Sequence, residues 1–340
     1  MTSPGSDDYR GLGWAHGALT IQRLGAMLAP VTFVLADGRQ VSPLHIAPWA
    51  DAPGTETLPG IVRKLRGEWP CVPFGYSMDP AGWPDSWARV MGPPEPDEEI
   101  HGHCANHHWT WAESDGRSLA LTLDYPAASP VAHVARTVTP DATAPAIDIQ
   151  FTIVVRRPCR LPIGLHPVFA LPAQTGAAEL ELGRFGHGRT YPADLGPWGS
   201  LFAKDRTFSE LSAVPAPGGG TVDASRLPFA TATEELLQIE GLDGVVALAN
   251  HAEGYRVRLS WQTEHFPSLL LWISNRARTS FPWNGRHLAI GIEPICSPFG
   301  LAPATAGAAN PIAQGGTPTT HGFMPGQAFT TRYRIEAMPL

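Results

Sequence analysis

Alternation of apolar and polar residues at every second position is the dominant pattern of this chain. Residues 147–153 read Ile-Asp-Ile-Gln-Phe-Thr-Ile, and residues 255–261 read Tyr-Arg-Val-Arg-Leu-Ser-Trp. Side chains of a β-strand point alternately to its two faces, so this period predicts strands with one buried face. Strands are also predicted at residues 118–124, 269–274, 288–292 and 330–336. The chain is therefore expected to be mostly β.

Turns and loops divide these strands. Asp37-Gly38 lies between two apolar segments, residues 31–36 and 40–43, and predicts a hairpin turn. One short helix is predicted over residues 231–239, with Glu234 and Glu235 near its beginning. Residues 79–99, 213–228 and 300–325 are rich in Pro, Gly or Ala and are predicted to be loops. Because strand patterning resumes after each loop, we expect an N-terminal tail, residues 1–15, and a single domain, residues 16–338.

Composition narrows the class of protein. Of the 340 residues, 43% are hydrophobic and 16% are charged, which is typical of a globular chain and not of a disordered one. The net charge of −7 argues against nucleic acid or an anionic membrane as the main partner. Eleven Trp residues could serve either as core or as walls of a carbohydrate pocket.

The cellular location is predicted from the N-terminal sequence, the absence of a long apolar run, and the spacing of the cysteines. Residues 1–10 are polar and acidic, without the basic and apolar regions of a secretory signal, and no apolar run approaches the roughly 18 residues of a membrane span. Four scattered Cys residues lack paired zinc spacing and are interpreted as reduced thiols. A cytoplasmic location is expected.

Two distant segments share one design. Gly164-Leu165-His166-Pro167 and Gly291-Ile292-Glu293-Pro294 each follow an apolar run, carry one titratable residue, and have Gly two positions earlier. Residues i and i−2 of a strand lie on the same face, so each titratable side chain stands beside a glycine. An imidazole and a carboxylate with cleared space nearby suit proton transfer to a sugar-sized ligand. We therefore predict that His166 and Glu293 are catalytic.

A cluster of histidines lies at residues 101–108, which read His-Gly-His-Cys-Ala-Asn-His-His. Its density suggests a metal site built from His101, His103 and His107. A metal site of the cupin type would add a Glu shortly afterwards, but the next acidic residue is Glu113. A substrate-binding role for the cluster is favoured over a metal site, and purely structural hydrogen bonding remains the other alternative.

Two further positions are candidates for substrate binding. Arg66 precedes Gly67 in a small basic cluster, and its guanidinium fork could hold a pair of hydroxyls or a phosphate, although an exposed loop Arg is an equal alternative. Asp243 lies in a Gly-Leu-Asp-Gly turn and is a weaker candidate. No nucleophile-elbow motif, phosphate-cradling loop or dinucleotide fingerprint is present.

The order of these motifs resembles the aldose 1-epimerase (galactose mutarotase) superfamily. Arg66-Gly67 leads to Pro73-Phe74-Gly75, then to His101-Gly102 with Asn106 and Trp109, then to His166-Pro167 with Phe169, and finally to Glu293-Pro294. The early motifs are most similar to the hexose-6-phosphate mutarotase branch. The resemblance covers residues 16–338. It implies an all-β supersandwich of large antiparallel sheets with an open sugar cleft.

The resemblance also implies a role for each matched residue. His166 would act as the general acid on the ring oxygen and Glu293 as the general base on the anomeric hydroxyl. Arg66, His101, His103, Asn106 and Asp243 would bind substrate. Interconversion of anomers would then need neither a metal nor an organic cofactor, the partner would be a small sugar, and exposed edge strands are compatible with a homodimer.

Several positions depart from that pattern. Ala105 stands where phosphate-sugar members tend to carry Arg, His103 replaces an aromatic residue, and Val168 replaces Tyr. His107 and His108 have no counterpart in the resemblance. Two alternatives to a mutarotase therefore stay open: a sugar-binding protein without turnover, and a metal-dependent isomerase or oxygenase that uses the histidine cluster.

Overall fold

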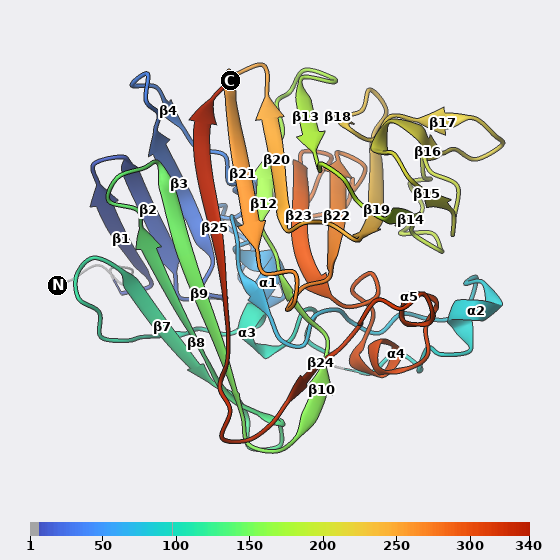
Figure 1. The fold of residues 1–340 in the computed structure, drawn as a ribbon, viewed down its shortest axis with the longest axis horizontal. Helices are drawn as coiled ribbons and strands as arrows, with labels where there is room; N and C mark the ends of the chain where they lie inside the picture. The colour runs from blue at the N-terminus through green and yellow to red at the C-terminus, as the bar shows by residue number, and fades with distance from the viewer. Residues whose placement is uncertain (1–6, 97) are drawn as a thin grey trace.

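The computed structural model describes residues 7–96 and 98–340, and its secondary structure is mainly antiparallel β-sheet. The largest sheet has nine strands, in the spatial order β18 (Arg226–Leu227), β13 (Ala178–Glu181), β20 (Val245–Asn250), β21 (Tyr255–Trp261), β25 (Phe329–Pro339), β9 (Ala146–Val155), β8 (Val131–Pro140), β7 (Leu119–Asp124) and β6 (Thr110–Trp111). The long strands β8, β9, β25 and β21 of this sheet run side by side in Figure 1.

The second large sheet has eight strands and carries the candidate site. Its order is β15 (Thr207–Phe208), β14 (His187–Thr190), β19 (Thr233–Glu240), β22 (Ser268–Asn275), β23 (Leu288–Cys296), β11 (Ile163–Leu165) and β5 (Pro70–Cys71), while β12 (Val168–Ala170) also pairs with β23. A four-stranded sheet comprises β1 (Tyr9–Trp14), β2 (Gly17–Gln22), β3 (Leu28–Val34) and β4 (Gln40–Val41).

Short elements complete the fold. Two small ribbons pair β10 (Cys159–Leu161) with β24 (His321–Phe323) and β16 (Val214–Pro215) with β17 (Thr221–Val222). The helices are α1 (Gly60–Arg63), α2 (Asp85–Ala88), α3 (His103–Asn106), α4 (Pro303–Gly307), α5 (Pro311–Gln314) and the 3-10 turn η1 (Leu211–Ala213). Among the described residues, no helix is long and apolar enough to span a membrane.

The two large sheets share one hydrophobic core. It contains Ile149 and Phe151 of β9 together with Leu269 and Leu271 of β22, all of them almost completely buried. A second cluster, rich in tryptophan, lies against the other face of the eight-stranded sheet and includes Leu270 of β22. Strands β22 and β23 therefore have apolar partners on both faces, which is why they read as continuous apolar runs in the sequence.

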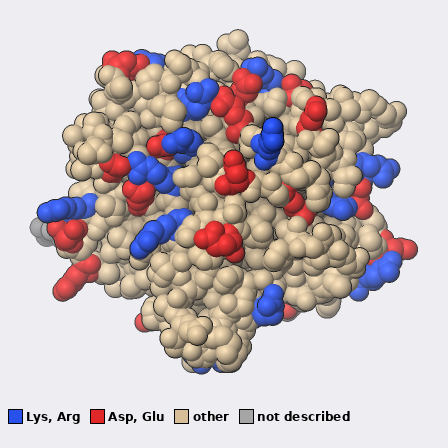
Figure 2. Space-filling view, viewed as in Figure 1, with Lys and Arg blue, Asp and Glu red and all other residues tan. Residues whose placement is uncertain are grey.

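The outward face of the nine-stranded sheet is polar. Arg334 of β25 pairs with Asp148 of β9 at 2.7 Å and with Asp141 at 2.6 Å. In Figure 2 basic and acidic side chains alternate over the visible face without forming a large patch of one sign. Such solvated pairs contribute little individually to stability, so we interpret this face as a solvent-facing surface of the sandwich.

The prediction of an all-β chain is confirmed, but the predicted helix over residues 231–239 is wrong. Most of that segment belongs to β19. Glu234 and Glu235, which suggested a first helical turn, are 1% and 2% exposed and point to opposite faces of the strand. Partners from other elements satisfy both carboxylates, so tertiary packing overrides the local preference.

The structure also bears on the predicted tail and hairpin. Residues 1–6 of the expected tail lie outside the described residues, whereas Tyr9–Trp14 form β1 and pair with β2. The turn at Asp37-Gly38 joins β3 to β4, and Gly38 has the positive φ of 84° that this turn requires. The four cysteines are free thiols.

Candidate active site

The register of three strands places His166 and Glu293 opposite each other. Gly164 of β11 pairs with Ile295 of β23, and Val168 of β12 pairs with Gly291 of the same strand. His166 lies in the short break between β11 and β12, where an unbroken register puts it directly across from Glu293. Main-chain hydrogen bonds hold the break, because the amide of His166 donates to the Trp69 carbonyl at 2.9 Å.

The side chains of His166 and Glu293 are close together but do not satisfy each other's hydrogen-bonding groups. His166 Nε2 lies 3.5 Å from Glu293 Oε1, within ion-pair range but without the geometry of a hydrogen bond. The residues are 5% and 1% exposed. Among the described residues, neither His166 Nδ1 nor Glu293 Oε1 has a hydrogen-bond partner. Buried polar atoms are usually paired, so atoms left free here are candidates to bind a ligand.

Burial shifts the pKa values of the two groups in opposite directions, toward the neutral form of each. It holds the pKa of His166 well below its usual value, and the neighbouring His101 ring lowers that pKa further. Burial also raises the pKa of Glu293 well above its usual value. Both groups favour their neutral forms, because a low-dielectric site solvates charge poorly. A neutral imidazole and a protonated carboxyl in contact hold one proton between them, and this proton can be exchanged with a bound ligand.

The glycines of the two matched segments make room for different neighbours. A Cβ at position 291 would lie 2.2 Å from Glu293 Oε1, so Gly291 clears space for the carboxylate, as the sequence pattern predicts. A Cβ at position 164 would instead lie 2.3 Å from the Phe74 ring. Gly164 thus admits Phe74 and does not itself clear space around His166.

Aromatic rings fix the orientation of the two cavity histidines. His166 stacks on Trp69 with ring centroids 4.2 Å apart, and the His101 ring stands edge-on to His166 at 5.1 Å. The backbone amide of Gly75 donates to His101 Nδ1 at 3.1 Å. Because burial lowers the pKa of His101 to about 3, this ring is neutral and carries its proton on Nε2. His101 is therefore a hydrogen-bond donor.

A cavity of about 160 Å³ opens over these groups. His101, His166 and Glu293 line it together with Tyr76 and Arg278, and the rest of the wall is aromatic and aliphatic: Ile61, Val62, Leu65, Trp69, Ile100, Leu195, Leu236, Leu270, Trp272, Trp283 and Phe299. An apolar wall with a few convergent polar groups is typical of small-molecule sites. Larger hollows occur on the surface, but neither His166 nor Glu293 lines them.

Arg278 is a cavity residue that the sequence did not reveal. Its guanidinium pairs with Glu234 Oε1 at 2.8 Å and lies 4.5 Å from the centre of the Trp283 ring. Glu234 also accepts a hydrogen bond from Trp272 Nε1 at 2.6 Å. Arg278 Nε is buried and has no hydrogen-bond partner among the described residues. A high count of Trp was the only sequence signal that pointed towards this corner.

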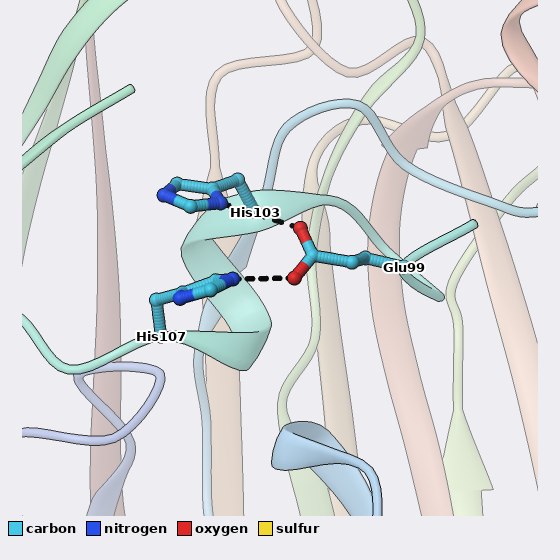
Figure 3. Close-up of side chains that lie close together, drawn as sticks. All are labelled: Glu99, His103 and His107. Carbon is cyan, nitrogen blue, oxygen red and sulfur yellow. Dashed lines mark hydrogen bonds and ion pairs between the residues drawn. The ribbon is translucent and has the colours of Figure 1, made fainter. Parts of the chain in front are cut away.

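Four of the predicted binding residues do not line the cavity. Arg66 donates to Asp51 at 2.6 Å, and Asp243 accepts the amide of Val245 in an exposed turn. Asn106 is structural: its side chain accepts the amide of Ile61 and donates to the carbonyl of Ile100. His103 points away from the cavity, toward Glu99 and His107 (Figure 3).

Comparisons with known proteins address the fold. No family profile and no curated protein sequence matches this chain. Solved structures do, including a GalM/aldose epimerase homologue from C. elegans, with a TM-score of 0.63, 13% identity, and coverage of 98% of this chain and 99% of the other.

Two bacterial proteins are similar to the same extent. For a galactose mutarotase-like protein from Clostridium acetobutylicum the TM-score is 0.61, with 11% identity and coverage of 98% and 95%. For one from Lactobacillus casei the corresponding values are 0.60, 13%, 97% and 99%. Such low identity carries information about architecture and not about activity. The chain has the antiparallel sandwich fold of galactose mutarotase-like proteins.

Proposed function

We propose that the protein is an aldose 1-epimerase that interconverts the α and β anomers of a neutral aldose. The observation that carries this proposal is the His166–Glu293 pair, whose side chains lie 3.5 Å apart at the strand break, are buried, and line the cavity. The hydroxyl and ring oxygens of an aldose are bonded to the same carbon. Two adjacent proton-transfer groups can therefore reach both oxygens from one side.

The reaction follows as a balanced proton exchange. The step starts from the tautomer in which the single proton of the pair lies on His166. Glu293 removes the proton of the anomeric hydroxyl while His166 delivers its proton to the ring oxygen, and the pair returns to the neutral form that burial favours. The bond between C1 and the ring oxygen breaks, and an open-chain aldehyde forms. Rotation about the C1–C2 bond presents the other face of the aldehyde, and reversal of the two transfers closes the ring. Each group would contribute about 10²–10⁴-fold.

The remaining cavity groups support binding of the sugar. His101 Nε2 and Arg278 Nε can donate to hydroxyls, and Trp272 and Trp283 offer apolar surface to the ring. The charge balance favours a neutral sugar over a phosphorylated one. Glu234 already neutralises Arg278 at 2.8 Å, and the basic residues Arg63 and Lys64 line a different hollow.

The proposal is tested by saturation-exchange NMR between anomers. A panel of neutral aldoses and their 6-phosphates is compared for wild type, Glu293→Gln and the matched control Asp243→Asn, whose carboxylate lies outside the cavity. We expect catalysed exchange of a neutral aldose by wild type and by the control, and a severe loss in Glu293→Gln. Exchange at the spontaneous rate for every sugar would contradict the enzyme and leave a binding protein of the same fold.

A further inference from the structure

Glu99, His103 and His107 form a compact group on the outer side of the segment that leads into the cavity. One potential ligand atom from each residue lies within 4.8 Å of the other two. Glu99 Oε2 is 3.3 Å from His103 Nδ1, and Glu99 Oε1 contacts His107 Nε2. Figure 3 shows the three side chains converging beside α3. None of them belongs to the proposed proton-transfer chemistry.

We propose that these three residues bind a divalent first-row transition metal ion such as Zn²⁺. Two imidazoles and one carboxylate are a donor set that Zn²⁺ accepts, with each ligand about 2.0–2.2 Å from the ion. Ligand atoms of one tetrahedral ion then lie about 3–4 Å apart, as Glu99 Oε2 and His103 Nδ1 already do. The side chains are 39%, 17% and 45% exposed, so a fourth position faces solvent.

The ligands are preorganised by the surrounding packing. The His103 and His107 rings stack with centroids 3.8 Å apart. His103 also packs on Tyr125, whose hydroxyl donates to the Val72 carbonyl at 2.7 Å. The carbonyl of His107 accepts the amide of Gly25 at 2.9 Å. These contacts keep the three side chains together before an ion binds, although the stacked rings, whose planes differ by 29°, must tilt for one nitrogen of each to face the same ion.

The metal would stabilise the segment that presents a cavity residue. His101 lies between two of the ligands and points into the cavity while they point outward. Its backbone has a positive φ of 60°, an unfavourable conformation for a residue with a side chain. An ion that joins Glu99 to α3 would hold this turn closed. Its role is structural and separate from the acid–base pair.

The sequence spacing of the group is Glu-x3-His-x3-His, with the acid before the histidines. The sequence offered a metal site of His101, His103 and His107 only as an alternative to substrate binding, and in space Glu99 stands in that group where His101 was considered. The cupin-type pattern requires an acid after the histidines, where the first is Glu113, and so does not describe this group.

The test measures metal and not activity. Untagged full-length protein, stripped with chelator and dialysed, is titrated with Zn²⁺ by calorimetry and with Co²⁺ by visible absorption. We expect wild type to bind about one equivalent. His107→Ala and Glu99→Gln should bind the metal at least about 10-fold more weakly, because changing even a neighbour of a metal ligand lowers metal affinity by about that factor. His108→Ala, which changes the adjacent exposed histidine, should bind as wild type.

Thermal unfolding supplies the second readout. Saturating Zn²⁺ should raise the melting temperature of wild type and His108→Ala but not that of His107→Ala, because a ligand that binds only the folded state stabilises it. Failure of wild type to bind stoichiometrically, or equal losses in His107→Ala and His108→Ala, would overturn the proposal. Glu99, His103 and His107 would then be a hydrogen-bonded cluster only. Both readouts are made without measuring anomerase activity.

Discussion

Two buried glutamates of this protein lie in opposite surroundings. Glu68 is completely buried, yet the Tyr333 hydroxyl donates to one of its oxygens at 2.5 Å and Arg136 pairs with the other. Glu293 is 1% exposed and lies 3.5 Å from His166, and its Oε1 has no hydrogen-bond partner among the residues that the structure describes. Burial raises the pKa of both, but at Glu68 the guanidinium and the phenol act against that rise.

The difference teaches how to separate a structural carboxylate from a functional one. A group whose oxygens are all paired contributes to a single arrangement of the core. A group that is dehydrated but not paired costs free energy in folding, and this cost must be offset by the rest of the fold. Such a group is retained where a ligand supplies the missing partner. Glu293 fits that description and Glu68 does not.

The largest expected effect separates the two glutamates by activity. Glu293→Gln keeps the shape of the side chain but cannot accept a proton, so we expect a loss of about 10²–10⁴-fold in the catalysed anomerisation rate. Polarimetry of a freshly dissolved anomer, with the spontaneous rate subtracted, measures it. A decrease smaller than about 10-fold would place the base elsewhere, since proton transfer by a positioned carboxylate exceeds that contribution.

The same substitution at Glu68 should act on stability instead. Glu68→Gln leaves the Arg136 charge buried without its partner, which costs about 3–5 kcal/mol in unfolding free energy. Urea unfolding followed by tryptophan fluorescence measures this loss. The double variant Glu68→Gln/Arg136→Met removes the orphaned charge and should recover part of it. An unchanged unfolding midpoint in Glu68→Gln would remove the contrast between the two sites.

A smaller effect is expected at the edge of the cavity. Arg278→Lys keeps the charge beside Glu234 but loses the planar fork and the Nε donor. A lost hydrogen bond to a charged group costs about 1.5–3 kcal/mol, so we expect at least a roughly 10-fold rise in KM with kcat affected less. Steady-state kinetics on the neutral aldose decide this. A fall confined to kcat would assign Arg278 to the chemical step.

The smallest expected effect is a difference between wild type and Glu293→Gln in how the free energy of unfolding depends on pH. Because the folded pKa of Glu293 lies above its usual 4.5, the folded state binds more protons than the unfolded state as pH rises past that value. Wild type therefore loses stability over this range, by about 1.4 kcal/mol for every tenfold difference in proton affinity between the folded and unfolded states. Glu293→Gln lacks this loss. We expect the variant to match wild type near pH 4 and to exceed it near pH 7. Equal stability at both pH values would show that Glu293 is not desolvated.

His166 changes stability in the opposite direction. Its folded pKa lies below the usual 6.5, so the unfolded state takes up the extra proton as pH falls below that value. Wild type therefore loses stability toward acid through His166, and a His166→Gln variant should lose less. Urea unfolding at a series of pH values measures both slopes, which together report how strongly the cavity excludes charge.

The sequence predicted the strands and the proximity of His166 and Glu293 better than it predicted the residues that line the cavity. Strands with one solvated face, such as β9 and β21, are visible as alternation. β19 was predicted as a helix because it is buried on both faces and contains two adjacent glutamates, a pattern that local propensity favours in helices. Its correct assignment depended on partners such as Trp272, which lies far away along the chain.

The cavity walls could not be predicted for a similar reason. Glu293 lies in β23 and His166 in the short break between β11 and β12, where the flanking register, a consequence of the apolar pattern, still places it. Tyr76, Arg278 and Phe299 come from loops, whose paths depend on contacts that no periodicity encodes. Arg66 illustrates the converse error: its motif is conspicuous, but Asp51 engages its guanidinium outside the cavity.

The strand break opposite β23 has a consequence for how the protein could change. The acid and the base are placed by main-chain pairing, whereas loop residues such as Trp283 and Phe299 shape the chamber above them. Replacing these loops could therefore change the substrate specificity while leaving the acid–base pair in place. Insertion of a single residue into β23 would do the reverse, turning the carboxylate to the opposite side of the sheet in one step.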